Sequence, residues 1–331
     1  MKKLLRSLVA LTMVLAMTGC GTGDSSSESD SSDLSEKKIG VIQLMQHDAL
    51  DRSYEGFKDV LVEAGVKEEN IDYQVAGDQS NCTTVADKLV NGDNDLIYAI
   101  ATPALQAAAS STQDIPIVGC AVTDYESTKL VKSNEKPGGN VTGASDLTPV
   151  SEQFDLLKQL LPNAKKVGIM YCSSEDNSKI QGDMAEKAAK KLGLEYVTRT
   201  ISDSNDIQSV VTQLTSNDGV DVIYIPTDNV LATYMSSVEA VASPAKIPVI
   251  TGEEGMCKEG GFATYGIDYY NLGKLAGEQA LAILKGEKTA AETPVEQLKA
   301  EDCTMVINLK VAQKCGIEIN KDDYKDATFI E

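Results

Sequence analysis

The feature that most constrains the fold is a short unit of strand, polar turn and helix that occurs twice in the chain. Its clearest copies are Asp95–Pro103, with the sequence DLIYAIATP, and Asp221–Asn229, with the sequence DVIYIPTDN. In each copy an acid precedes a short apolar run, and a turn that contains threonine leads into a pattern typical of a helix. A short apolar run bounded by polar residues is typical of a buried strand.

Two further pairs of segments repeat in the same order. KKIGV at 37–41 matches KKVGI at 165–169, and IPIV at 115–118 matches IPVI at 247–250. Chance likeness between short apolar strings is common, but three matches in one order predict a single α/β unit used twice. Because apolar strands alternate with helical patterns, we expect an α/β protein of two lobes. Each lobe is predicted to be a doubly wound parallel sheet that is covered on both faces.

The first residues predict export from the cytoplasm. Residues 1–6 carry positive charge, residues 7–16 are largely apolar, and the run ends at Cys20. The apolar run is too short to span a bilayer, so residues 1–19 are expected to be a signal peptide. The small residues before Cys20 resemble a bacterial lipobox, which implies lipidation of the Cys20 sulfur. An ordinary signal peptide with an incidental cysteine is the alternative.

Residues 20–36 are rich in Ser, Asp and Gly, a composition that predicts a disordered tether because it cannot bury enough apolar surface. A lipid followed by a tether and a large body predicts an extracytoplasmic protein, anchored by its lipid to the bacterial cell membrane. No later stretch of the sequence is apolar enough to predict a membrane span.

Composition argues against several functions. The chain has 30 basic and 50 acidic residues, for a net charge of −20, so no nucleic-acid partner is expected. His47 is the only histidine, and no nucleophile elbow, Walker loop or dinucleotide fingerprint follows a predicted strand. We therefore expect no enzyme, no cofactor and no metal. The six cysteines besides Cys20 show no CxxC spacing, and no disulfide pairing is assigned.

Seven short segments fall where predicted strands end. They are HDALD at 47–51, AIATPA at 99–104, AVTD at 121–124, PGGNVTG at 137–143, SEDNS at 174–178, PTDN at 226–229 and GIDYY at 266–270. Together they resemble the substrate-binding proteins of ABC importers, and in particular the TrpX-like group associated with tryptophan and tyrosine. The resemblance covers residues 38 to about 320. The family reads Asp-Pro where this chain has Asp124-Tyr125, a departure that is expected to alter the wall of the cleft.

The resemblance implies the periplasmic-binding-protein type I architecture, in which two lobes are joined by three crossings. The first lobe is then expected at 37–122 with about 269–300, and the second at about 145–265 with about 301–325. Crossings are expected near 122–124 or 142–148, near 264–268 and near the final strand.

The resemblance also implies a function. A monomer would capture a small ligand by closure of its lobes, most simply an aromatic amino acid, and present it to an ABC permease. A sugar or nucleoside carrier and a sensory ligand-binding module on the same fold are the alternatives, and turnover of a bound compound would indicate an enzyme.

The candidate site lies beyond the carboxyl ends of the strands, where helix N-termini present free N–H groups. Thr102 and Pro103 begin one such helix, and this turn is expected to receive an anion such as a ligand carboxylate. Asp228 and Asn229 occupy the equivalent place in the second lobe and are expected to bind a ligand ammonium group. In both places the alternative is that the side chain only caps its own helix.

The remaining candidates follow other strands or lie near the crossings. The residues near crossings could bind the ammonium group or lock the hinge, and those of the second lobe are expected to face His47 of the first. These candidates are His47, Asp124, Asp146, Ser174, Glu175, Asn177, Glu253 and Asp268.

Overall fold

The structure is a computed structural model that describes residues 33–299 and 302–331. The predicted signal peptide and the predicted lipidation site at Cys20 lie outside the described residues. The end of the predicted tether is ordered, which corrects its boundary at residue 36. Leu34–Glu36 forms a short 3-10 turn, and Leu34 belongs to the hydrophobic core of the first lobe.

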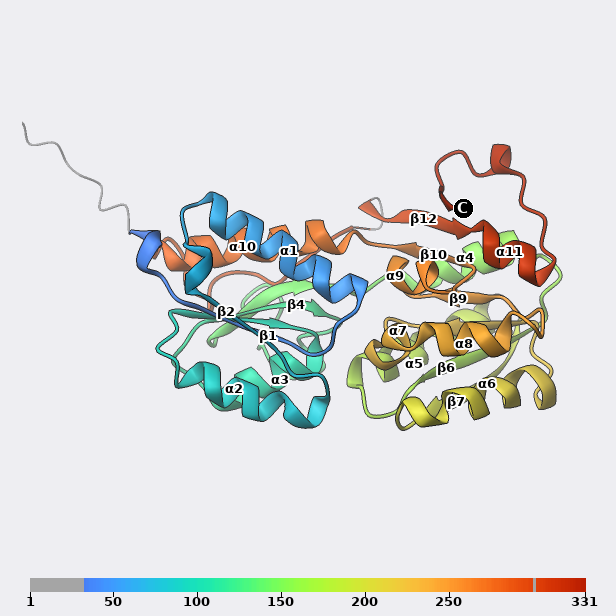
Figure 1. Cartoon of the computed structure of the whole chain (residues 1–331), viewed down its shortest axis with the longest axis horizontal. Coiled ribbons are helices and arrows are strands. Elements are labelled where there is room, and N and C mark those ends of the chain that lie inside the picture. The colour runs from blue at the N-terminus through green and yellow to red at the C-terminus, as the bar shows by residue number, and fades with distance from the viewer. Residues whose placement is uncertain (1–32, 300–301) are drawn as a thin grey trace, which may run out of the picture. The chain divides into compact units, whose positions relative to one another are not determined.

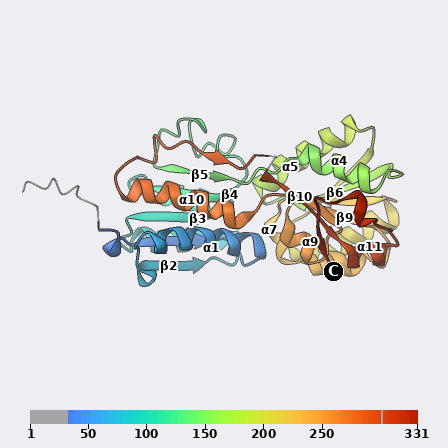
Figure 2. The same ribbon diagram turned by 90° about the horizontal axis from the view of Figure 1, so that it is seen from above.

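The first sheet contains six parallel strands. They are β1 Ile39–Gln43, β2 Ile71–Val75, β3 Leu96–Ile100, β4 Ile117–Val122, β5 Val141–Ser145 and β11 Glu296–Gln297. Their spatial order is β11-β5-β4-β3-β1-β2. α1 (Asp48–Glu63) and α10 (Tyr269–Leu284) lie side by side on one face of this sheet, while α2 (Cys82–Val90) and α3 (Thr102–Ser111) cover the other (Figure 1, Figure 2).

The second sheet contains seven strands. They are β6 Lys166–Cys172, β7 Glu195–Ile201, β8 Val222–Ile225, β9 Val249–Thr251, β10 Ala263–Gly266, β12 Thr304–Asn308 and β13 Thr328–Ile330. Their order is β13-β12-β10-β9-β8-β6-β7, and β12 runs antiparallel to β10 while the other neighbours are parallel. Its helices are α4 Val150–Leu160, α5 Asp176–Lys191, α6 Ile207–Thr212, α7 Asn229–Thr233, α8 Met235–Ala242, α9 Glu254–Lys258 and α11 Leu309–Cys315.

The second sheet is apolar on both faces, as its sequence predicts. Along β8, Val222 and Tyr224 pack into one core with α4, α5 and α11, whereas Ile223 and Ile225 pack into another with α6, α7 and α8. Successive side chains of a strand point to opposite faces, so a strand that is buried on both sides has no polar alternate positions.

The duplication appears in the topology of the two sheets. The order β2-β1-β3-β4-β5 in the first sheet is repeated as β7-β6-β8-β9-β10 in the second. The acid that opens each copy has the same task. Asp95 accepts hydrogen bonds from the Lys38 backbone and the Lys37 side chain, and Asp221 accepts from the backbone of Lys165 and Lys166. The repeated acid and the repeated lysine pair therefore tie neighbouring strands together at their starts.

The chain passes between the sheets three times, after β5, after β10 and after β11. The expected crossing near 122–124 is wrong, because the chain stays with the first sheet until Ser145. Tyr125 is fully buried there and donates a hydrogen bond to the Ala144 carbonyl at 3.2 Å. The tyrosine in place of the family's proline therefore packs inside the first lobe and does not line the cleft.

Close helix packing fixes the two first-lobe segments that reach the cleft. A Cβ atom at Gly56 of α1 would lie 2.0 Å from the Tyr270 carbonyl oxygen, and one at Gly273 of α10 would lie 2.1 Å from the Ser53 carbonyl oxygen. Only glycine allows the two backbones to approach this closely. This contact sets the start of α1, at Asp48, relative to the start of α10, at Tyr269.

Candidate functional site

A cavity lies between the lobes, beyond the carboxyl ends of their strands. Its empty volume is about 290 Å³, including space that is open to solvent, and little of it is wide enough for a water molecule. Its polar lining comes from both lobes and from the crossings: His47, Thr123, Asp146, Asn177, Thr227, Asp228, Asn229, Glu253 and Tyr269. The walls must separate before a ligand as large as an amino acid can enter.

Direct contacts between the lobes surround this cavity. His47 Nε2 lies 3.2 Å from Asn229 Oδ1, and Gln181 Nε2 donates to Thr123 Oγ1 at 3.2 Å. Farther out, Lys258 of α9 lies 3.2 Å from Asp48 of α1. The lobes are therefore in contact across the site in this structure.

Three carboxylates line the cavity, and each one also organises the local structure. Asp228 caps α7 by accepting from the Leu231 N–H at 2.8 Å, and its other oxygen accepts from the Cys172 N–H at 2.6 Å. Glu253 caps α9 through the N–H groups of Gly255 and Met256.

The third carboxylate, Asp146, follows β5 at the first crossing. It accepts from the hydroxyls of Thr123, at 3.3 Å, and Tyr269, at 2.9 Å. Asp146 thus connects the first crossing to the start of α10, which follows the second crossing.

The electrostatics of the cavity favour a cation. None of the described residues that line it is a lysine or an arginine. Burial raises the pKa of Glu253 to about 7 and that of Asp146 to about 6. Burial also raises the pKa of Asp228. A buried carboxylate without a positive partner is costly to ionise, and a cation placed among these groups would reverse that cost.

A network behind the wall orients the second-lobe amides. Glu175 is buried, and its Oε2 accepts from Asn177 Nδ2 at 2.9 Å, from Asn229 Nδ2 at 2.7 Å and from the Asn229 backbone N–H at 3.2 Å. Burial, followed by repulsion from Asp228, raises the pKa of Glu175. Glu175 therefore positions two amides that reach the cavity, while it is not itself among the lining residues.

The first-lobe wall has a different character. α1 begins at Asp48, His47 before it provides no side-chain cap, and Ala49 and Leu50 of the first turn line the cavity. The backbone at Ala121, which also lines the cavity, has φ of 54°, and Ala101 at the end of β3 has φ of 84°. Non-glycine residues rarely adopt positive φ, so these two strand ends hold an uncommon backbone conformation.

Six of the predicted site residues line the cavity: His47, Asp146, Asn177, Asp228, Asn229 and Glu253. Glu175 supports them from behind. The other five lie elsewhere, and two of them, Thr102 and Pro103, are buried at the start of α3.

The last three predicted residues serve local structure. Asp124 closes a turn by accepting from the N–H groups of Glu126 and Ser127, and Asp268 caps α10. The Ser174 hydroxyl lies 3.1 Å from the Cys172 sulfur.

Sequence reasoning did not assign a role to Gln181. It lies inside α5, where it bonds to the hydroxyls of Thr123 and Thr227, one in each lobe. No sequence signal marks a glutamine in the middle of a helix for such a role. Thr123 and Thr227 lie within the strand-end segments AVTD and PTDN, so the same sequence pattern predicts that they lie near the site.

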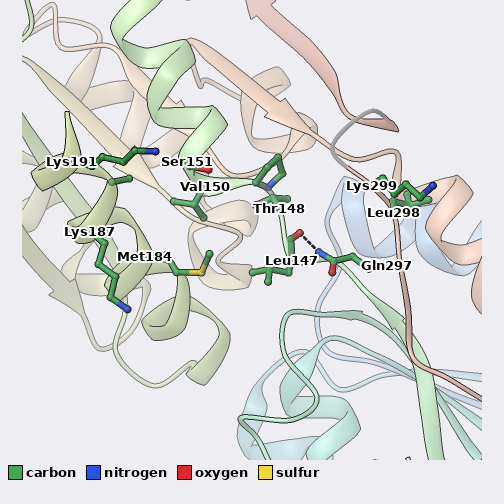
Figure 3. A pocket seen from close by; sticks show the side chains of 12 residues that line it. Leu147, Thr148, Val150, Ser151, Met184, Lys187, Lys191, Gln297, Leu298 and Lys299 are labelled. Carbon is green, nitrogen blue, oxygen red and sulfur yellow. Dashed lines mark hydrogen bonds between the residues drawn. The ribbon is translucent and has the colours of Figure 1, made fainter. Parts of the chain in front are cut away.

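A larger groove lies at the hinge (Figure 3). Its empty volume is about 1160 Å³, on the measure that gives about 290 Å³ for the cavity. The groove runs between the first crossing, α5 and the chain at β11, where Gln297 donates to the Leu147 carbonyl at 2.8 Å. Its floor is apolar, with Val150, Met184 and Leu298, and exposed lysines flank it. None of the predicted site residues lines this groove.

Membrane spans, metal clusters and disulfides were sought in the part of the chain that the structure describes. Among residues 33–299 and 302–331, no helix is both long and apolar enough to cross a membrane, and no cluster of three metal-ligating side chains occurs. The six cysteines of this part of the chain are all unpaired thiols.

Two doubly wound lobes, three crossings and a cavity at the facing strand ends define a two-lobed solute-binding protein of the periplasmic-binding type I class. The family model described as ABC transporter substrate binding protein matches residues 38–329. The chain belongs to this family of ABC-importer substrate-binding proteins, which act outside the cytoplasm.

Three relatives are informative. A tyrosine-binding protein of Clostridioides difficile (strain R20291) is 41% identical over 316 residues, which cover 93% of this chain and 90% of the relative. An ABC domain from Streptococcus pneumoniae, solved in complex with L-Trp, is 41% identical with a TM-score of 0.83, over 89% of this chain and all of that one.

The third relative is the ligand-free, open structure of a substrate-binding protein with adhesive properties from Clostridium difficile. It is 38% identical and covers 89% of this chain and 99% of that one, with a TM-score of 0.68. Leucine-binding and sugar-transporter proteins at 14% and 15% identity share the fold alone.

Proposed function

We propose that this protein captures an aromatic amino acid between its two lobes and presents the closed complex to an ABC permease. The observation that carries the proposal is the cavity, where Asp146, Asp228 and Glu253 converge and the described lining contains no lysine or arginine. Such a site favours a ligand with a positive group. The tyrosine-binding relative and the relative solved with L-Trp support the aromatic class.

The proposed orientation of the ligand rests on the carboxylates at the cavity and on the N–H groups at the start of α1. The ammonium group faces the carboxylates at the cavity, and the carboxylate faces the uncapped first turn of α1 at Ala49 and Leu50. N–H groups at a helix start, together with the helix dipole, favour an anion. This assignment moves the expected carboxylate site from α3 to α1, because Thr102 and Pro103 do not line the cavity.

Closure of the lobes gives the capture mechanism. The described structure is closer to the ligand complex, at a TM-score of 0.83, than to the open ligand-free relative, at 0.68, although the coverage of this chain is equal. A ligand that bridges both walls contributes contacts that only the closed state provides, so its binding shifts the population toward closure. The closed monomer is then the species that the permease recognises.

A thermal-shift screen against amino acids, nucleosides and sugars tests the proposal. A ligand that binds only the folded state raises the melting temperature by mass action. We expect tyrosine, tryptophan or phenylalanine to raise it and sugars to leave it unchanged. A shift with a nucleoside or sugar alone would favour the carrier alternative, and turnover of the bound compound would indicate an enzyme.

We further propose that the mature protein begins at a lipidated Cys20, which anchors it to the outer side of the cell membrane. The support is the sequence of the segment before Cys20 and the Ser/Asp-rich stretch after it. Metabolic labelling with a fatty acid should label the protein and fail for Cys20→Ala. Cys303→Ala, which changes the one described cysteine that is not buried, is the matched control and should label normally.

A further inference from the structure

Two hydrogen-bond acceptors at the cavity have no partner. His47 Nδ1 and Asn177 Oδ1 are shielded from solvent, and neither forms a hydrogen bond with a described group. Both residues line the cavity, His47 from the first lobe and Asn177 from the second. Nearly all buried polar atoms in native proteins have a hydrogen-bond partner. Two acceptors without a partner at one cavity therefore mark a place where a ligand can donate hydrogen bonds to them.

The hydrogen-bond network fixes which His47 nitrogen carries the proton. Glu175 Oε2 accepts from the Asn229 backbone N–H, so it is an acceptor, and the Asn229 group that faces it must be the donating Nδ2. Asn229 Oδ1 therefore faces His47, and Nε2 must be the protonated nitrogen that donates to it at 3.2 Å. Nδ1 is then left with a free lone pair, since a neutral imidazole has one donor and one acceptor.

The Asn177 amide is fixed in the same way. Its Nδ2 donates to Glu175 Oε2 at 2.9 Å and to the Thr227 carbonyl at 3.1 Å, and both partners are acceptors. Its Oδ1 therefore has no donor to meet. Asn177 is 3% exposed, so solvent does not supply one freely.

We infer that one primary ammonium group of the ligand completes this site by donating to His47 Nδ1 and Asn177 Oδ1 together, and so joins the two lobes. An ammonium group has three N–H donors and no acceptor, which matches a site made only of acceptors. A hydroxyl offers a single donor and cannot satisfy both atoms. This inference rests on the proposed function, because it requires a ligand that carries a primary ammonium group.

The protonation state of His47 agrees with this role. Burial lowers the pKa of His47 to about 4, so the ring is neutral at neutral pH and Nδ1 keeps its lone pair. His47 is thus a specificity-determining residue that selects for N–H donors.

Nuclear magnetic resonance and two substitutions test the inference. His47 is the only histidine, so the two ring nitrogens of histidine-labelled protein give unambiguous ¹⁵N signals. With saturating L-tyrosine, we expect Nε2 to be protonated and Nδ1 to be an unprotonated, hydrogen-bonded acceptor. His47→Gln keeps a donor within reach of Asn229 but removes the Nδ1 acceptor. His47→Asn keeps a polar atom near the place of Nδ1 but no longer reaches Asn229.

His47→Gln should weaken L-tyrosine, L-tryptophan and L-phenylalanine alike, by roughly 10- to 100-fold, because all three share the ammonium group and a hydrogen bond to a charged group is lost. His47→Asn should weaken them less. A loss confined to tyrosine and tryptophan would assign Nδ1 to a ring donor and overturn the inference, as would a protonated Nδ1 or unchanged affinity in His47→Gln. If the unmodified protein binds none of the three, the proposed function fails instead.

Discussion

The helices that reach the cavity from the two lobes differ in how they begin. In the first lobe, α1 starts at Asp48, and His47 before it makes no side-chain cap to the first N–H groups. In the second lobe, Asp228 caps α7 and Glu253 caps α9. A side-chain cap satisfies N–H groups that a ligand would otherwise bind. On the proposed function, the uncapped start of α1 receives the ligand carboxylate and the acids at the cavity receive its ammonium group.

The capping acids of the second lobe are costly to ionise. An acid that caps a helix in a buried wall is held by N–H groups, but burial without a cation still raises its pKa. On the proposed function, closure over a ligand ammonium group relieves this cost.

The largest effect is expected from Asp146→Asn. The partners of Asp146 are the hydroxyls of Thr123 and Tyr269, which can rotate to accept from an amide, whereas the backbone N–H partners of Asp228 and Glu253 cannot. The substitution should remove the charge with little change in fold and weaken amino-acid binding by about 2–3 kcal/mol, roughly 100-fold. Isothermal titration calorimetry measures the dissociation constant.

Asp124→Asn is the matched control for this substitution. Asp124 uses one carboxylate oxygen to close an exposed turn and does not line the cavity, so its variant should bind as the unmodified protein does. Equal affinity of Asp146→Asn and the unmodified protein would remove this acid, which lies at the first crossing, from the proposed ammonium site.

A change of pH should move stability and binding in opposite directions. The folded pKa of Glu253 is about 7 against an ordinary 4.5, so the folded state binds more protons between these values and gains stability as pH falls through 7. Glu175 and Asp146 shift in the same direction. His47, with a folded pKa of about 4 against 6.5, opposes them as pH falls below 6.5.

Because the carboxylates outnumber the histidine, the ligand-free protein should melt higher at pH 6.5 than at pH 8. A ligand ammonium group binds the ionised carboxylates, so affinity should fall below pH 7 by up to about tenfold per pH unit for each linked proton. Melting curves and calorimetry over pH 5.5–8 measure both trends. Affinity that rises on acidification would contradict the assignment of the second-lobe wall to a cation.

The sequence was sufficient for the fold because its repeat records the topology. The repeated acid, just before β3 or β8, accepts hydrogen bonds from the repeated lysine pair at the start of β1 or β6. The repeated residues therefore make equivalent contacts in the two sheets. The site was only partly predictable. Thr102 and Thr123 both follow first-lobe strands, but only Thr123 reaches the cavity. A local sequence pattern predicts where each strand ends. Which of these strand ends faces the other lobe depends on the order of the strands and on where the chain crosses between the lobes.

Adding a methyl group where the two lobes touch should reduce ligand affinity less than removing a charge does. In the closed structure, a Cβ atom at Gly255 of α9 would lie 2.8 Å from Asp48 Cβ in α1. Gly255→Ala should therefore hinder closure and weaken binding about tenfold, since overpacking costs about 1–3 kcal/mol.

Gly139→Ala is the control for the added methyl group, because a Cβ atom there meets nothing within 4 Å. The ligand-free melting temperature of Gly255→Ala should stay close to that of the unmodified protein if the free protein is open. A large drop in that temperature with unchanged affinity would place the glycine contact in the fold rather than in closure.

The smallest effect should come from the ion pair at the rim, where the two walls meet outside the cavity. Lys258 lies 3.2 Å from Asp48 of the other lobe and 3.0 Å from Glu254 of its own helix, and its side chain is 40% exposed. Exposed pairs contribute about 0.2–1 kcal/mol and are screened by salt, so Lys258→Ala should weaken binding about threefold or less, and only at low ionic strength. Lys179→Ala, which breaks a pair with Asp183 inside the second lobe, should leave affinity unchanged. A loss for Lys258→Ala as large as that for Asp146→Asn would mean that rim charge, rather than the difference between the buried walls, governs ligand capture.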